Sequence, residues 1–572
     1  MKREFFKKNL IIFACTLIAL IFLFKNLGNV YFWSDEAYSA VCAKNTALFG
    51  YPKSFDGRNI AQHYWLIDGQ WRFAPFNRTT PWLHLYMGAA SFLLFGFNNF
   101  AARFPFALTG FATIICLFLF LRKYEKNPFI VNTALVLLTF CIPFYLHMRQ
   151  CRYYAPAALF TLLATWGYLD FFNTGRKRYF IIATTFLFLS LQSAIAVFIL
   201  TVIIHSLLRF DKERFKNLVL CGAAVALIAV PHAIQLRLWE RPEDLLNWET
   251  TMTARLYTSR IFCYNMHFNN YVFPYVLVFV FLVWAGIKGY FNKKAFGARE
   301  HLSFLLILCT INLFFLAYVA PQHFRMVLHH VPEVCILGAY VIYFFRQRMG
   351  KYAALILLSI ISTSNVLHVL PYQISKIPGI HQAVAGAIKN VYHWDIWGWM
   401  LWKMSLRAPV HSYQAEYVYE ITHDYDGPIE GIAKYLNTHA GTDDIVKISY
   451  GDYALQFYTD RFIIPRGEIK NDVIPDWLIL RGDYWKTRRQ NPPLDQYFAP
   501  LIEKEFEKIV IDYPEINWEN NPEPEYHKYQ TVVIDYRQIQ PVVIYRRKKP
   551  YPELSRQEKS AMINKLWEQK SY

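Results

Sequence analysis

The strongest constraint on the fold is a series of long apolar runs that recurs from residue 9 to residue 371. Most of these runs are about 17–21 residues long, and a helix of roughly 20 apolar residues crosses the hydrocarbon core of a bilayer. Charged residues make up only 18% of the 572 residues, below the usual quarter for soluble proteins. The sequence therefore predicts a polytopic α-helical membrane protein rather than a string of soluble domains.

The apolar runs divide into eleven predicted spans. No small-residue cleavage site follows residue 24, so we interpret the first run as a retained span rather than a cleaved signal peptide. Residues 179–208 are too long for one span, and we interpret them as two short spans that turn near Gln192 and Ser193. The other predicted spans are 10–24, 104–121, 129–147, 155–172, 217–236, 271–288, 302–320, 325–345 and 352–371.

The basic residues decide the predicted orientation. The net charge of +18 lies in short clusters between apolar runs, which argues against a nucleic-acid-binding protein. If residues 81–97 do not cross the membrane, every basic cluster falls on the inner side, as the positive-inside rule expects. We therefore interpret 81–97 as a juxtamembrane or re-entrant helix on the outer face. The N-terminus is then inside and the C-terminus outside.

This topology predicts three regions of the chain. Residues 1–371 form the transmembrane domain, and residues 29–103 within it form a large outer loop with juxtamembrane helices. Residues 372–412 carry four Trp among apolar residues, which is typical of a helix in the lipid headgroup layer. Residues 413–572 alternate short apolar strands with helical stretches, which indicates a soluble α/β domain. The predicted strands are DIVKIS, RFII, DWLIL, KIVIDY and PVVIYR, with helices at 427–441, 452–459 and 494–507.

The sharpest candidate for chemistry is the carboxylate pair Asp35 and Glu36, which follows the first span. One interpretation is structural, because Ser34 can cap a helix and acids in a first helical turn favour the helix dipole. The other is functional, because a carboxylate at the outer membrane surface can act as a general base. From the spacing alone, helix capping is the more common of the two.

Arginines gather in the predicted outer segments, against the usual bias of basic residues towards inner loops. Arg149 and Arg152 share a short outer loop, and Arg58 and Arg78 lie in the large outer loop. The planar guanidinium matches a phosphate group in a bidentate way. A snorkelling anchor is the alternative for Arg149 and Arg152, and Tyr153 beside them fits an interfacial aromatic belt as well as a site.

Metal and cofactor signals are weak. We find no set of His, Cys, Asp and Glu residues with the spacing of a metal site. Six of the nine Cys lie in apolar runs, so no disulfide framework is predicted. The C-terminal region carries no glycine-rich phosphate-binding motif.

Several motifs, taken in order, resemble the GT-C superfamily of membrane glycosyltransferases, and most closely the protein O-mannosyltransferases and lipid A aminoarabinose transferases. An Asp-Glu pair opens the first outer loop in that family, as here. The further matching stretches are Arg78-Thr79-Thr80-Pro81, Leu83-His84-Leu85-Tyr86, Phe95-Gly96, Ala101-Ala102-Arg103-Phe104-Pro105, Arg149-Gln150-Cys151-Arg152-Tyr153-Tyr154, and Phe324-Arg325 with Pro332. Phe457-Tyr458 and Pro475-Asp476-Trp477 are similar to soluble domains of bacterial members. One departure is Gln192, where many members have His.

The resemblance implies an inverting glycosyltransferase that uses a polyprenyl-phosphate-linked sugar as donor. The acceptor would be a glycan, lipid A or a protein on the outer face of a bacterial inner membrane. Asp35 would be the general base, assisted by Glu36. The donor phosphate or substrate would be held by Arg58, Arg78, Arg149, Arg152, Tyr153 and Arg325. No nucleic-acid partner and no required cofactor are expected, although some distant members use a divalent cation.

Two other classes of function stay open on the sequence. A transporter or flippase of lipid-linked sugars would show charged or broken helices in mid-membrane and paired halves, whereas the predicted spans are nearly free of acids. A non-catalytic assembly or sensor protein that works through the C-terminal domain would not need Asp35 beside a basic loop.

Overall fold

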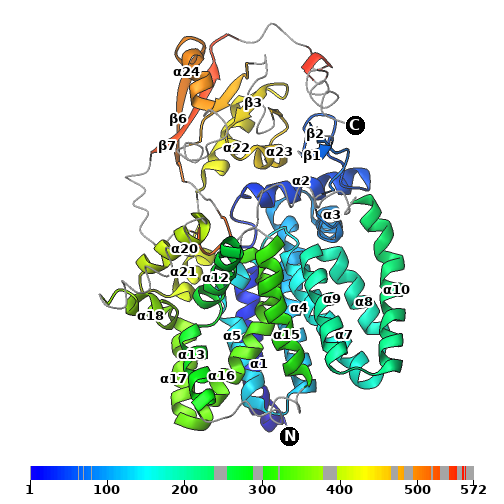
Figure 1. Ribbon diagram of the computed structural model, residues 1–572. Coiled ribbons are helices and arrows are strands. Elements are labelled where there is room, and N and C mark those ends of the chain that lie inside the picture. The colour runs from blue at the N-terminus through cyan, green and yellow to red at the C-terminus, as the bar shows by residue number, and fades with distance from the viewer. Residues whose placement is uncertain are drawn as a thin grey trace.

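The computed structural model describes residues 2–561 except 62–63, 68–69, 79, 237–253, 288–299, 320–322, 378–395, 425, 465–473, 482–493, 517–519, 528–539, 550–554, 556 and 560. It consists of a helical bundle with a small sheet domain at one end (Figure 1). The first helix, α1 (Lys2–Phe24), begins at the opposite end of the bundle from that sheet.

The bundle has the helices of an integral membrane protein. Within the described chain, five helices are long and apolar enough to cross a membrane, or eight if each of three bent pairs counts as one span. The five include α4 (Asn99–Tyr124), α7 (Tyr154–Thr174), α10 (Lys212–Gln235), α15 (Glu300–Val319) and α16 (Val331–Met349). Many apolar side chains on these helices, such as Leu227 at 78%, remain exposed, as expected of a surface that faces lipid. The total of eleven spans stays a prediction.

Three helix pairs in the described chain are sharply bent at a short break, and two of them fall within single predicted spans. α5 (Pro128–Thr139) meets α6 (Ile142–Met148) at 59°, and α12 (Ala254–Tyr271) meets α13 (Tyr275–Ile287) at 104°. α17 (Lys351–Thr363) meets α18 (Val366–Ile374) at 88°. Proline removes a backbone donor and blocks helix continuation, and Pro143 opens α6 while Pro274 precedes α13. The predictions of single helices over 129–147 and 352–371 are therefore wrong.

The short apolar helices agree with one prediction and leave another open. α8 (Arg178–Ser190) and α9 (Gln192–Leu208) meet at Leu191, so the turn predicted near Gln192 is confirmed. α3 (Leu83–Phe95) has 13 residues, which at about 1.5 Å per residue falls short of a roughly 30 Å bilayer core. α8 has the same length as α3. Helix length alone therefore does not separate the two, and the topology depends on the charge pattern.

The C-terminal domain contains the predicted α/β sheet. Its five strands lie in the order β4-β3-β5-β7-β6, with β3 parallel to β4 and β5, and β7 antiparallel to β5 and β6. The strands are β3 (Ile445–Ile448), β4 (Phe462–Ile464), β5 (Trp477–Ile479), β6 (Phe506–Pro514) and β7 (Pro541–Arg547). The helices around them are α22 (Pro428–His439), α23 (Asp452–Tyr458) and α24 (Leu494–Glu505). All five strands and all three helices match the predicted segments.

Two further helices connect the bundle to the sheet. α20 (Ile396–Arg407) contains Trp397, Trp399 and Trp402 of the predicted interfacial segment, whereas Trp394 lies outside the described residues. α21 (Tyr413–Thr422) follows it and packs its Tyr417 against the bundle, where the Tyr417 hydroxyl donates to the Phe22 carbonyl over 2.8 Å.

The segment predicted to be the large outer loop, residues 29–103, lies between the bundle and the sheet domain (Figure 1). It contains α2 (Ser34–Phe49), the hairpin of β1 (Tyr64–Ile67) and β2 (Gln70–Phe73), and α3. Asp35 and Glu36 occupy the first turn of α2, as predicted. The predicted capping by Ser34 is wrong, because the helix begins at Ser34, and Trp33, at the cap position, makes no side-chain capping bond.

Aromatic contacts hold the sheet domain on the start of α2. The Phe32 ring lies 4.9 Å from that of Phe457, and Tyr38 lies 5.0 Å from Tyr453. The hydroxyl of Tyr458 accepts from the Phe32 backbone N–H over 2.9 Å and donates to the Asn99 side chain over 2.6 Å. These contacts fix the residues just before Asp35 between the two domains.

Candidate active site

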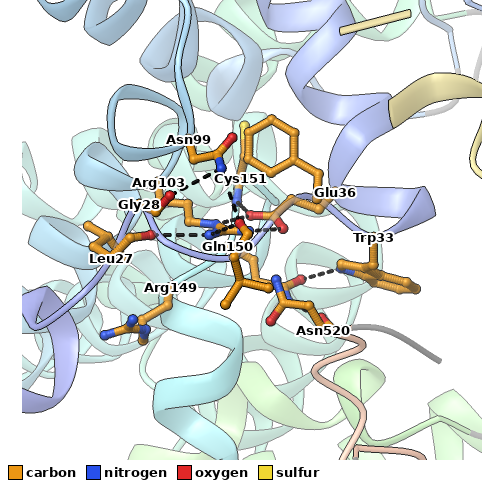
Figure 2. Close-up of polar contacts among 12 residues, drawn as sticks. Leu27, Gly28, Trp33, Glu36, Asn99, Arg103, Arg149, Gln150, Cys151 and Asn520 are labelled. Atoms are coloured by element: carbon orange, nitrogen blue, oxygen red, sulfur yellow. Dashed lines mark hydrogen bonds and ion pairs between the residues drawn. The ribbon is translucent and has the colours of Figure 1, made fainter. Parts of the chain in front are cut away.

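Glu36 is sealed in the protein. Its carboxylate is fully buried and accepts two bonds from the guanidinium of Arg103 on α4, at 2.7 and 2.8 Å (Figure 2). The backbone N–H of Cys151 donates to the same carboxylate over 3.2 Å. Such a bidentate, charge-assisted pair satisfies both carboxylate oxygens, so Glu36 has no oxygen left to present to a substrate.

Arg103 extends this contact to the end of α1. Its Nη1 donates to the carbonyls of Leu27 and Val30, at 3.1 and 2.7 Å. The Glu36–Arg103 pair therefore ties together α4, the start of α2, the chain after α1 and the loop at Cys151 (Figure 2). We interpret Glu36 as a residue that fixes the orientation of the first turn of α2.

Asp35, one residue earlier, lies beside two arginines. Nη1 of Arg325 donates to its carboxylate over 3.0 Å, and Nη2 of Arg152 lies 3.6 Å from the same oxygen. Arg152 is itself held by the Asp35 carbonyl at 2.9 Å and by the Ser39 hydroxyl at 3.0 Å. The side chain of Asp35 nevertheless keeps 39% of its surface accessible. Asp35 is thus both paired and reachable.

The charge of Asp35 follows from these neighbours. Burial within the protein favours the neutral carboxyl, but the guanidiniums of Arg152 and Arg325 outweigh it and lower the pKa of Asp35 below its ordinary value. Asp35 is therefore ionised at neutral pH. It can accept a proton from a group that becomes acidic during a reaction.

Arg325 also contacts a second carboxylate, that of Glu523. Arg325 lies on the single 3-10 turn η2 (Phe324–Met326), just before α16. Its Nε is 3.2 Å from the carboxylate of Glu523, and its backbone N–H donates to the other oxygen of Glu523 over 3.2 Å. Glu523 belongs to the sheet domain and is 2% exposed. Sequence reasoning missed it, because Glu523 and Glu525 in the stretch Asn520–His527 form no motif that points to a site.

Tyr153 packs against Arg152 beside Asp35. Its ring is buried, with Arg152 lying 5.0 Å from the ring centroid. His84 and Tyr154 pack on it at 5.7 and 4.7 Å. A guanidinium over an aromatic face is attracted by the ring and is held in place by it, so Tyr153 orients Arg152 towards Asp35.

Arg149 has other partners. Its Nη1 donates to the carbonyls of Phe22, Leu23 and Lys25, at 2.9, 3.3 and 2.8 Å, and its Nη2 donates to that of Asn26 at 3.2 Å. Phe22 and Leu23 are in the last turn of α1, whose carbonyls have no intrahelical donors, and Lys25 and Asn26 directly follow the helix. The guanidinium of Arg149 therefore caps a helix, and Figure 2 shows it directed away from Glu36 and Cys151.

Arg58 and Arg78 lie elsewhere in the predicted outer loop. Arg58 donates to the carbonyl of Asp460 and lies 5.2 Å from the Phe462 ring, so it contacts the sheet domain. Arg78 is buried, with its guanidinium 4.7 Å from the Phe76 ring. The charged contacts to Asp35 come instead from Arg152 and Arg325.

A protein family matches part of the sequence, and solved structures match the fold. Residues 79–234 match the family of dolichyl-phosphate-mannose-protein mannosyltransferases, and no curated protein matches the sequence. The crystal structure of ArnT from Cupriavidus metallidurans bound to undecaprenyl phosphate superimposes with a TM-score of 0.50 at 13% identity, covering 94% of this chain and 97% of that chain. The same protein in the apo state gives a TM-score of 0.52 at 14% identity, covering 93% and 97%. The predicted resemblance to the GT-C superfamily is thereby confirmed, by a mannosyltransferase family match over residues 79–234 and by an ArnT-like fold along nearly the whole chain.

Proposed function

We propose that this protein is an inverting glycosyltransferase that moves one sugar from a polyprenyl-phosphate donor to an acceptor on the outer face of a bacterial inner membrane. The observation that carries the proposal is Asp35, an accessible carboxylate beside two arginines where the bundle meets the sheet domain. The donor class is supported by the ArnT structure bound to undecaprenyl phosphate. The acceptor is a hydroxyl or amine of a glycan, lipid A or a protein.

The proposed reaction is a single displacement. The acceptor attacks the anomeric carbon and loses its proton to the carboxylate of Asp35, which acts as the general base. The bond between that carbon and the phosphate oxygen breaks, and the lipid phosphate leaves as an anion. One displacement from the opposite face inverts the anomeric configuration.

Arg152 and Arg325 are proposed to bind the donor phosphate. Guanidinium groups pair with phosphate oxygens in a bidentate way and stabilise negative charge that develops on a leaving group. The phosphate competes with Asp35 for the same N–H groups. Donor binding therefore weakens the contacts between the arginines and Asp35 and raises the pKa of Asp35. The carboxylate of Asp35 is then a stronger base when the acceptor arrives.

The other residues predicted for the site take supporting roles in this proposal. Tyr153 orients Arg152, and Glu36 fixes the turn that carries Asp35. Arg58 and Arg78 remain candidates for substrate contact through the outer loop, whereas Arg149 serves to cap α1. The reaction as written needs no cofactor. Within the described ranges, no group of three or more His, Cys, Asp or Glu residues is arranged to hold a metal ion.

Transport of lipid-linked sugars is the second candidate function. The observation in its favour is the three bent helix pairs, since broken helices are a feature of transporters. Against it, Asp35, Arg152 and Arg325 all lie outside the candidate spans. Protein solubilised in detergent separates the two functions, because a transferase still joins sugar to acceptor without two compartments and a transporter produces nothing.

The test begins with mass spectrometry of glycans and lipid A from wild-type and deletion cells, which defines the product as a mass difference. The transfer rate is then measured in isolated membranes, which contain the native donor and acceptor. We expect Asp35→Asn to lower the rate by roughly 100-fold or more, the usual scale for a lost general base. A deletion strain with unchanged glycans and lipids, together with no transfer in detergent, would refute the transferase.

A further inference from the structure

We propose that Glu523, which the sheet domain contributes, is a positioning residue of this active site: it holds Arg325 in a pairing shared with Asp35, so that Asp35 stays available as the base. This inference rests on the function proposed above. In this proposal the sheet domain contributes a residue that positions the active site.

Glu523 controls both the side chain and the backbone of Arg325. One carboxylate oxygen lies 3.2 Å from Nε of Arg325, and the other accepts the Arg325 backbone N–H over 3.2 Å. The turn that carries Arg325 is only three residues long, and a turn this short has little hydrogen bonding of its own. A carboxylate that holds the backbone and the guanidinium together therefore sets where Nη1 of Arg325 points, which is at Asp35.

The guanidinium of Arg325 is divided between two acids. Its Nε side meets Glu523 and its Nη1 side meets Asp35, at 3.2 and 3.0 Å. Without Glu523, the full charge of Arg325 would act on Asp35. The negative charge of Glu523 opposes the two arginines and raises the pKa of Asp35, although the net direction stays below the ordinary value. Glu523 thus preserves the basicity that Asp35 needs.

Glu523 is itself reliably charged. Burial alone would raise the pKa of its carboxyl group, but Arg325 outweighs this, with help from His147 and His323, and holds the pKa of Glu523 below its ordinary value. His147 lies 3.9 Å from the carboxylate. A buried carboxylate is costly unless it is paired, and here the pairing partner is the arginine proposed to bind phosphate.

The segment 520–527 that carries Glu523 is anchored independently on both sides. At its start, the Gln150 side chain donates to the Asn520 carbonyl over 3.0 Å and accepts from the Trp33 indole over 2.7 Å (Figure 2). At its end, a ring nitrogen of His527 lies 2.8 Å from the carboxylate of Glu420 on α21. These contacts dock the segment without using Arg325. The Glu523–Arg325 contact is therefore available for a task other than docking.

The test compares Glu523→Gln with Glu420→Gln in the full-length protein. Glu420→Gln weakens the anchoring of the same segment at His527 and leaves the charges around Asp35 unchanged, so it is the matched control for docking. Transfer rate is measured in isolated membranes between about pH 2.5 and about pH 8, a range that extends below the ordinary Asp pKa of about 3.9. Hydrogen exchange of segment 520–527 in the purified protein reports how firmly it docks. Asp35→Asn is measured alongside as the test of the proposed function itself.

We expect Glu523→Gln to lower the transfer rate by about 10- to 100-fold, the scale of a lost hydrogen bond to a charged group. Because the lost negative charge lowers the pKa of Asp35, the acidic limb of the rate profile should move to lower pH. Glu420→Gln should speed exchange of the segment but change the rate by less than about threefold and leave the limb in place. Glu523→Asp, which keeps the charge, should leave the limb in place and retain more activity than Gln.

Two results would overturn the proposal while leaving the proposed function intact. One is parental transfer by Glu523→Gln when Asp35→Asn is inactive. The other is an equal loss of transfer rate in Glu523→Gln and Glu420→Gln when the two variants show equal hydrogen exchange in segment 520–527 and an unchanged acidic limb. That result would make Glu523 a docking residue only. Parental transfer by Asp35→Asn would instead remove the proposed base, and the proposal about Glu523 would fall with it.

Discussion

Asp35 and Glu36 are neighbours in the chain with opposite environments. Successive residues in a helix point about 100° apart, so the first turn of α2 sends the two carboxylates to different places. Glu36 is fully buried and receives three hydrogen bonds, two from Arg103 and one from Cys151. Asp35 faces two arginines and keeps 39% of its side chain accessible.

The difference teaches which acid can do chemistry. A carboxylate whose oxygens are all taken by fixed donors stabilises structure, because freeing it would leave a buried charge unpaired. A carboxylate whose partners are arginines proposed to bind phosphate can give up those contacts when the donor binds. By this argument the network of Glu36 exists to place Asp35, and substitutions at the two positions should fail in different ways.

The largest effect is expected from Glu36→Gln, and it concerns stability. Removing one partner of a buried ion pair usually costs about 3–5 kcal/mol, because the other charge is left uncompensated. Here that charge is Arg103, which is 3% exposed. Thermal unfolding of the purified protein should show a large fall in Tm. The double variant Glu36→Gln with Arg103→Met should recover part of it. A Tm equal to that of the parent in Glu36→Gln alone would contradict the structural role of the Glu36–Arg103 pair.

Substitutions of the arginines that contact Asp35 should lower the transfer rate rather than the stability. Lys keeps the charge of Arg152 or Arg325 but loses the bidentate fork, so Arg152→Lys and Arg325→Lys should each lose about 10- to 100-fold in transfer rate. Binding of undecaprenyl phosphate to the purified variants should weaken in parallel. Parental rates and parental binding in both would show that neither arginine holds the donor phosphate.

Arg149 sharpens the comparison, because it lies three residues from Arg152 and has another task. Lys at 149 cannot reach all four carbonyls at the end of α1, so Arg149→Lys should cost about 1.5 kcal/mol of stability, the lower end for hydrogen bonds to a charged group. Its transfer rate per folded molecule should stay within about twofold of the parent. A loss of donor binding as large as in Arg152→Lys would return Arg149 to the phosphate site.

The smallest effect is a pH dependence of domain docking through His527. Burial lowers the pKa of His527, but Glu420 outweighs it and raises the pKa above the ordinary value. A raised folded pKa means that the stabilisation is fully present below about pH 6.5 and is lost as the pH rises through the raised value. Protection of segment 520–527 against hydrogen exchange should therefore be greater at about pH 6 than at about pH 9, by roughly 1 kcal/mol. Glu420→Gln should abolish that difference, and the same pH dependence in the variant would exclude the pair as its cause.

Much of the fold could be predicted from the sequence, because local patterns determine it. Apolar runs gave the long helices, and short β-branched runs such as Ile445–Ile448 gave the strands of the sheet. The bends were missed because hydropathy does not register a change of helix direction, although Pro143 and Pro274 mark two of the three. Local composition cannot show how separate helices and loops meet in space.

The site was predictable where a motif is contiguous and not where it is assembled from distant segments. Asp35, Arg152 and Arg325 were found through short motifs, and the structure brings them together. Arg149 shares the motif of Arg152, yet the geometry of the loop points it at α1. Glu523 lies 198 residues from Arg325 and only the folded sheet domain brings it there, so no reading of sequence spacing could have identified it.

The most direct test of the central claim measures transfer by Asp35→Asn and thermal stability in the same preparation, with Glu36→Gln beside it. The account predicts that Asp35→Asn unfolds within about 1 kcal/mol of the parent, as expected for a partly exposed pair, while its transfer falls by roughly 100-fold or more. Glu36→Gln should show the reverse order, with a large fall in Tm and a smaller loss of rate per folded molecule. Near-parental transfer by Asp35→Asn, in membranes that contain equal amounts of folded protein, would contradict the account.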